Sequence, residues 1–104
     1  MIKTYKEYEL MATRPNIKLQ PNVDNDVYAL LNAQVGYHAV TVGTALRIQN
    51  KGSLPVYIHE STSSAEKDGG TTLDSGIQAT TETDSPGVIA TCLVSEGVIN
   101  VEVI

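Results

Sequence analysis

The chain has 104 residues, a formal charge of −5, 41% hydrophobic residues and five tyrosines as its only aromatic side chains. This length indicates one domain with a thin core and marginal stability, which association with other subunits would relieve. The acidic balance argues against nucleic acid as a partner, because nucleic-acid binding needs a basic surface. No apolar run approaches the ~20 residues of a membrane span, so we expect no membrane contact either.

The charge is unevenly distributed along the chain. Residues 1–20 carry four basic and two acidic side chains (+2), whereas residues 21–104 carry three basic and ten acidic ones (−7). The first stretch also lacks the alternation that follows, and Pro15 and Pro21 favour extended backbone. We therefore expect an extended N-terminal arm over residues 1–22, with a short helix over residues 3–11 as the alternative, and a β-sandwich domain over residues 23–104.

Residues 27–35 fit two secondary structures. Val27, Leu30, Leu31 and Val35 satisfy helical spacing after a possible Asp or Asn cap. The neighbouring segments carry strand signals, however, and Gly36 follows directly. We favour a strand here and keep the helix as the alternative.

Short alternating runs separated by turn residues fill the rest of the chain. Val56 and Ile58 share one parity, which places Tyr57 and His59 on the opposite face of their strand. The Gly- and Ser-rich stretch 61–76 is expected to be a loop. About seven short strands of this kind predict an all-β fold, an antiparallel β-sandwich that is jelly-roll-like. Besides 27–35, the expected strands are 38–42, 45–50, 55–60, 77–83, 88–94 and 98–104.

Few residues indicate chemistry. Cys92 is the only cysteine, so an internal disulfide and a cysteine-based zinc site are excluded, and its parity with apolar neighbours predicts a buried thiol. A nucleophilic site would need His38 or His59 beside Cys92 or a serine. No phosphate-binding loop or metalloprotease motif occurs, and we expect no catalytic residue, no metal site and no cofactor. Calcium binding by loop carboxylates is a weaker hypothesis, because the spacing of these acidic residues matches no EF-hand. The carboxylates concerned are Glu60, Glu66, Asp68, Asp74, Glu82 and Asp84.

Contact with partner subunits is the alternative to catalysis or metal binding. Tyrosine is common at protein interfaces, and the arm holds more apolar side chains than a free tail needs. The candidate partner-binding residues are Tyr5, Tyr8, Leu10, Arg14, Ile17 and Tyr57.

Two segments resemble small structural proteins of tailed bacteriophages. The first is GTALRIQNKGSLPVYIHE at residues 43–60, in which a Leu-x-Ile-Gln-Asn strand leads through a small-residue turn into a Val-x-Ile strand. The second is DSPGVIATCLVSEGVINVEV at residues 84–103, with a Ser-Pro-Gly turn and a closing Val-x-Val strand. The resemblance covers roughly residues 24–104.

The resemblance implies a non-enzymatic virion component that is made in the host cytoplasm. Its implied role is that of a capsid decoration (cement) protein that bridges subunits of the major capsid protein. Because a thin sandwich with exposed edge strands is completed when subunits meet around a symmetry axis, we expect it to oligomerise as a trimer on a capsid three-fold axis. A tail-fibre, tailspike or neck component is the alternative.

Overall fold

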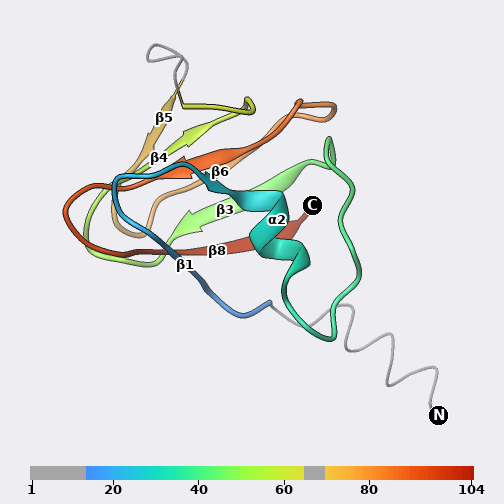
Figure 1. Cartoon of the computed structure of the whole chain (residues 1–104), viewed down its shortest axis with the longest axis horizontal. Coiled ribbons are helices and arrows are strands. Elements are labelled where there is room, and N and C mark those ends of the chain that lie inside the picture. The colour runs from blue at the N-terminus through green and yellow to red at the C-terminus, as the bar shows by residue number, and fades with distance from the viewer. Residues whose placement is uncertain (1–13, 65–69) are drawn as a thin grey trace.

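The computed structural model describes residues 14–64 and 70–104. In this part of the chain, eight strands form two four-stranded antiparallel sheets, and the expected β-sandwich is confirmed (Figure 1). The first sheet contains, in order, β1 (Ile17–Leu19), β8 (Gly97–Val103), β3 (Leu46–Asn50) and β6 (Gln78–Thr80). The second contains β2 (Asn25–Asp26), β7 (Ile89–Thr91), β4 (Val56–His59) and β5 (Thr71–Leu73).

The strand pairing is nested. β1 pairs with β8, β2 with β7, β3 with β6 and β4 with β5, all antiparallel. The pairs β3–β8 and β4–β7 then join these ladders into the two sheets. This pairing pattern is that of one long antiparallel hairpin that folds over to form two packed sheets.

The core lies between the sheets and follows the period-2 alternation of their strands. Leu46 and Ile48 of β3 face inward, and so do Val56 and Ile58 of β4. Cys92 is also buried and free, as its parity predicts. Buried side chains of both sheets and of the helix form one cluster, which includes Ile17, Leu19, Val27, Tyr28, Leu31, Leu73, Val88, Ala90, Ile99 and Val101.

The preference for a strand at residues 27–35 was wrong. Helix α2 (Val27–Asn32) occupies this position at one end of the sandwich (Figure 1). Asp26 caps it, because its carboxylate accepts the Ala29 N–H at 3.1 Å. The first turn buries Val27 and Tyr28 against the core, and the Tyr28 hydroxyl donates to the Thr44 carbonyl at 2.5 Å. Burial raises the pKa of Tyr28.

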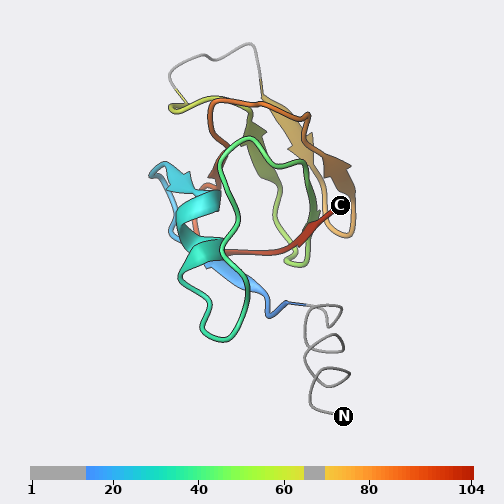
Figure 2. The same cartoon turned by 90° about the vertical axis from the view of Figure 1, so that its right-hand side faces the viewer.

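The strand expected at residues 38–42 was also wrong. This stretch belongs to the long loop that runs from α2 past the end of the sandwich to β3 (Figure 2). The main-chain groups that would pair in a sheet are bound by side chains instead. The Asn32 amide donates to the Val40 carbonyl at 2.9 Å and accepts the Val40 N–H at 2.6 Å, and Arg14 binds the His38 carbonyl.

Two other boundaries differ from those expected. Strand β1 lies inside the stretch 1–22 and pairs with β8, so that residues 17–19 belong to the first sheet. Strand β5 lies inside the loop expected at 61–76, where Thr71, Thr72 and Leu73 pair with β4. Leu73 is 1% exposed and anchors this strand in the core. Neither α2 nor any other element of the described chain is a helix long and apolar enough to cross a membrane.

Candidate functional site

The outer face of the first sheet is an open, polar surface. The register places Asn100 of β8 opposite Gln49 of β3, and Gln49 opposite Gln78 of β6. On the other side, the Asn100 amide donates to the Asn16 side-chain oxygen at 3.1 Å. We call these four residues the amide row. They cross the whole sheet without a charge.

Positive charge lies on both sides of the amide row. Lys18 of β1 and Arg47 of β3 are exposed, and Lys51 is exposed just beyond the end of β3. Glu102 is the only carboxylate within the described strands of this sheet, and it lies opposite Arg47 on the same face. The other described carboxylates lie in the second sheet or in loops, at Asp24, Asp26, Glu60, Asp74, Glu82, Asp84 and Glu96. The first sheet thus presents a basic face, defined by Lys18, Arg47 and Lys51, on an acidic protein.

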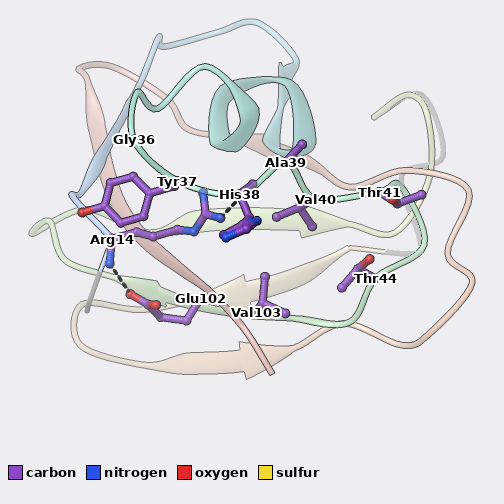
Figure 3. A pocket seen from close by; sticks show the side chains of 10 residues that line it. All are labelled: Arg14, Gly36, Tyr37, His38, Ala39, Val40, Thr41, Thr44, Glu102 and Val103. Carbon is purple, nitrogen blue, oxygen red and sulfur yellow. Dashed lines mark hydrogen bonds between the residues drawn. The ribbon is translucent and has the colours of Figure 1, made fainter. Parts of the chain in front are cut away.

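Arg14 is buried and fixes one corner of this sheet. Its Nη2 donates to the His38 carbonyl at 2.7 Å, and its Nη1 lies 3.4 Å from the Leu31 carbonyl and 3.3 Å from the Gln34 side-chain oxygen. Its guanidinium lies 5.0 Å from the centre of the Tyr37 ring (Figure 3). Neutral oxygens and an aromatic ring therefore hold this cation within the chain.

A cavity of about 400 Å³ opens beside Arg14 (Figure 3). Tyr37, His38 and Glu102 contribute polar groups to it, and Val40 and Val103 contribute apolar surface. The Glu102 carboxylate accepts the Arg14 main-chain N–H at 2.9 Å. Since Arg14 is already bound to main-chain oxygens, its role at this cavity is to hold the loop after α2 against β8.

A second cavity of about 410 Å³ lies beside the second sheet. His59, Cys92, Asp24 and Ser64 all line it. The sequence analysis named His59 beside Cys92 or a serine as the requirement of a nucleophilic site, and the fold brings these residues from separate segments to one cavity. It did not point to Asp24 or to Ser64 in particular. The Ser64 hydroxyl and N–H both donate to the Asp24 carboxylate, which lowers the pKa of Asp24.

The polar side chains of this cavity have different partners. Ser64 is bonded to Asp24, and the Cys92 sulfur lies 3.6 Å from the Gln20 carbonyl. His59 Nδ1 is buried without a hydrogen-bond partner in the described part of the chain. No cluster of three His, Cys, Asp or Glu that could hold a metal ion occurs among the described residues. Glu66 and Asp68, two of the possible calcium ligands, lie outside those residues.

The six candidate partner-binding residues fall into three groups: two are buried, one is half-buried, and three lie outside the described residues. Arg14 is 8% exposed and Ile17 is 5% exposed, so both side chains are used inside the chain. Tyr57 is half-buried on the outer face of the second sheet, opposite Thr91 and Thr72, as its parity predicts. Tyr5, Tyr8 and Leu10 lie outside the described residues. The amide row was missed, although the alternation of Arg47 and Gln49 with buried neighbours does mark the outer face of β3.

Comparisons with family models, with curated proteins and with solved structures find no match to this chain.

Proposed function

We propose that this chain is a non-enzymatic structural protein of a tailed-bacteriophage virion. In this proposal it associates with itself and decorates the capsid, where it stabilises the shell by bridging subunits of the major capsid protein. The basic face is the observation that carries the proposal. The described strands of the first sheet hold Lys18, Arg47 and, opposite Arg47, Glu102. With the exposed Lys51 just beyond β3, three basic side chains and one carboxylate give this side a net charge of +2.

Charge separation of this kind suits a protein that lies between other subunits. A basic face can pair with an acidic surface of the shell, and the acidic remainder keeps the protein soluble and repels further copies from that side. The uncharged amide row adds hydrogen-bonding groups to the same face, and polar contacts of this kind are typical of interfaces that form after folding.

The strand order supports the proposal at the level of fold. Nested pairs 1–8, 2–7, 3–6 and 4–5 give the orders β1-β8-β3-β6 and β2-β7-β4-β5, and we interpret them as a double-sheet jelly roll. Jelly rolls form viral capsid domains, lectin domains and cupins. Because one fold hosts many functions, this argument supports a capsid role only together with the surface and the sequence resemblance.

The proposal also includes the N-terminal segment and the oligomeric state. We propose that residues 1–13 form an arm whose Tyr5, Tyr8 and Leu10 contact a neighbouring subunit. In this proposal the trimer forms on the particle, where three copies bind around a capsid three-fold axis through contacts with the shell and with one another. Arg14, the residue after this segment, anchors the chain at one corner of the first sheet.

Co-sedimentation with empty, expanded capsids that lack tails tests this function. We expect the wild-type chain to bind, and more weakly as the salt concentration rises. The double variant Arg47→Gln/Lys51→Gln should bind about tenfold less tightly, equivalent to about 1.4 kcal/mol. The control Thr62→Glu/Thr72→Glu changes the net charge equally, at exposed positions shortly after β4 and in β5 of the second sheet, and it should bind like wild type. Absence of wild-type binding would contradict the proposal.

A tail-fibre, tailspike or neck component is the second candidate. It is favoured by Tyr57, which is half-buried on the outer face of the second sheet between two threonines, Thr72 and Thr91. An aromatic ring beside hydroxyl groups is a suitable platform for a sugar, and lectin domains share the jelly-roll architecture. Binding only to particles that carry a portal or tail would favour this candidate over capsid decoration.

A further inference from the structure

Strand β6 (Gln78–Thr80) is an open edge of the first sheet. It pairs with β3 on one side and has no strand on the other. Gln78 and Thr80 are exposed, and Ile77 just before them is 52% exposed. No residue of β6 is charged. Natural edge strands usually carry a charge, a proline or a cover that prevents pairing with another chain, and β6 has no charge or proline.

Hydrogen bonds on either side of β6 show which of its main-chain groups are free. The Asn50 N–H donates to the Ile77 carbonyl at 3.0 Å, and the Thr81 N–H donates to the Leu46 carbonyl at 2.8 Å. In an antiparallel ladder, hydrogen-bonded pairs alternate with pairs that do not bond. Ile77 and Thr81 therefore point their main-chain groups at β3, whereas Gln78 and Thr80 point theirs away from the sheet.

Two other edges are protected. On β1, the outward main-chain groups belong to an exposed lysine, Lys18, in a stretch between Pro15 and Pro21. On β2, Asp24 and Asp26 place carboxylates along the edge, and Asp26 also begins helix α2. These features match the devices that keep edge strands apart. The fourth edge, β5 (Thr71–Leu73), also lacks a charge and a proline, but the exposed Asp74 follows it directly. β6 has no charged residue within it or directly beside it, so it is the edge that we consider for pairing.

We propose that β6 pairs antiparallel with β6 of a second copy of this chain across a two-fold axis. This inference rests on the proposed function only for the claim that the chain associates with itself. Placing Gln78 opposite the partner's Thr80 matches free groups with free groups. Each of the two symmetric pairs then forms two main-chain hydrogen bonds.

The neighbouring registers fit less well. A shift that places Thr80 opposite the partner's Thr80 would bring Gln78 opposite the partner's Glu82, whose N–H already donates to the Glu60 carboxylate at 2.7 Å. The favoured register uses no group that is already bound. It also places Ala79 on the two-fold axis and Ile77 beside the partner's Thr81, where the exposed isoleucine gains cover.

The pairing joins two four-stranded sheets into one of eight strands and extends the amide row from Gln78 to the partner's Thr80. The contact is short, so we expect it to be weak for two isolated molecules, with a dissociation constant on the order of 100 µM. On a particle, contacts of this strength act together with others and gain from high local concentration.

Sedimentation of the full chain over a range of concentrations tests the pairing. We expect a dimer at high concentration, and a monomer for Thr80→Pro. That proline removes an N–H that points away from β3, so the fold keeps its own bonds. The matched control Lys18→Pro removes an outward N–H from the β1 edge and should dimerise like wild type. A wild-type monomer at 1 mM would overturn the proposal, as would equal dimerisation of Thr80→Pro.

Oxidative cross-linking tests the register and does not require the proline variant to fold. Ala79 lies opposite itself in a non-bonded pair, where Cα atoms are about 4.5 Å apart, within the range of a disulfide. Ala79→Cys should therefore give a covalent dimer, and Gln78→Cys should give at least tenfold less, because it lies opposite the partner's Thr80. Equal yields, or none from Ala79→Cys, would overturn the register. Capsid binding by Thr80→Pro separates this inference from the proposed function. If this variant no longer dimerises but still binds capsids, β6 pairing is not needed for capsid decoration, and the proposed binding to the capsid stands.

Discussion

The guanidinium of Arg14 donates to the main-chain oxygen of His38 at 2.7 Å and thereby joins the start of the sandwich to the loop after helix α2. The two residues lie 24 positions apart, and no strand pairing connects their segments. In this loop Val35 is 94% exposed, whereas Val40 is 7% exposed and packs in the core. Arg14 and the side-chain bonds of Asn32 therefore hold the loop together with the burial of Val40.

We expect Arg14→Lys to destabilise the fold by about 2 kcal/mol, because a lysine keeps the charge but lacks the planar fork that reaches several acceptors. Urea unfolding followed by circular dichroism measures the change. Arg47→Lys is the matched control, since Arg47 is exposed, and it should change stability by less than about 0.5 kcal/mol. Equal effects of the two substitutions would contradict the anchoring role of Arg14.

Asn50 is a fully buried amide that ties the end of β3 to the second sheet. It donates to the carbonyls of Leu54 and Leu73, both at 2.8 Å, and accepts the Gly52 N–H at 2.8 Å. We expect Asn50→Asp to cost about 3 kcal/mol, because a buried carboxylate would face two carbonyl oxygens. Asn16→Asp on the exposed face should cost far less. Thermal unfolding of both variants at pH 7 tests the difference.

The Asp24 carboxylate gives a pH dependence with a definite sign. Side-chain and main-chain hydrogen bonds from Ser64 lower its pKa below the ordinary 3.8. The stabilisation is therefore complete above pH 3.8 and is lost as the pH falls through the lower folded value. Ser64→Ala should raise the Asp24 pKa in an NMR titration, whereas Ser95→Ala should leave it unchanged. An unaltered Asp24 pKa in Ser64→Ala would show that this contact is absent in solution.

Gly70 lies against the imidazole of His59. A Cβ at position 70 would stand 2.8 Å from His59 Cε1, closer than real contacts allow. Since His59 is 9% exposed, its ring has little room to move. We expect Gly70→Ala to destabilise by about 1–2 kcal/mol and His59→Ala to relieve part of that cost in the double variant. A double-mutant cycle measures the coupling, and strictly additive effects would count against this contact. Gly52→Ala, with ordinary contacts, is the control.

Val94 adopts a positive φ of 76° and is 86% exposed. A β-branched residue pays a steric cost in this region. Val94→Gly should therefore stabilise the fold by roughly 1 kcal/mol, measured by urea unfolding. Leu93→Gly, at the exposed neighbouring position, should bring no such gain. A loss of stability in Val94→Gly would indicate that this turn has another conformation.

The sequence predicted the parts of the fold that depend on local alternation. The inward positions of Leu46, Ile48, Val56 and Ile58 follow from the period of a strand, as does the outward position of Tyr57. Cys92 was also predicted as buried, since it shares parity with Val88 and Ala90. The candidate site was predicted far less well, because the amide row joins residues from different segments that become neighbours only through the strand register.

By itself, the sequence determined that this chain is an acidic, all-β sandwich, because residue types and their period of two act over a few neighbouring positions. Only the tertiary structure decided which strands pair and which edge stays open. The same holds where local signals were balanced: Val27–Asn32 became a helix since its apolar face packs on the core, and Thr71–Leu73 became a strand through pairing with β4. Such choices depend on partners tens of residues away, which no local pattern encodes.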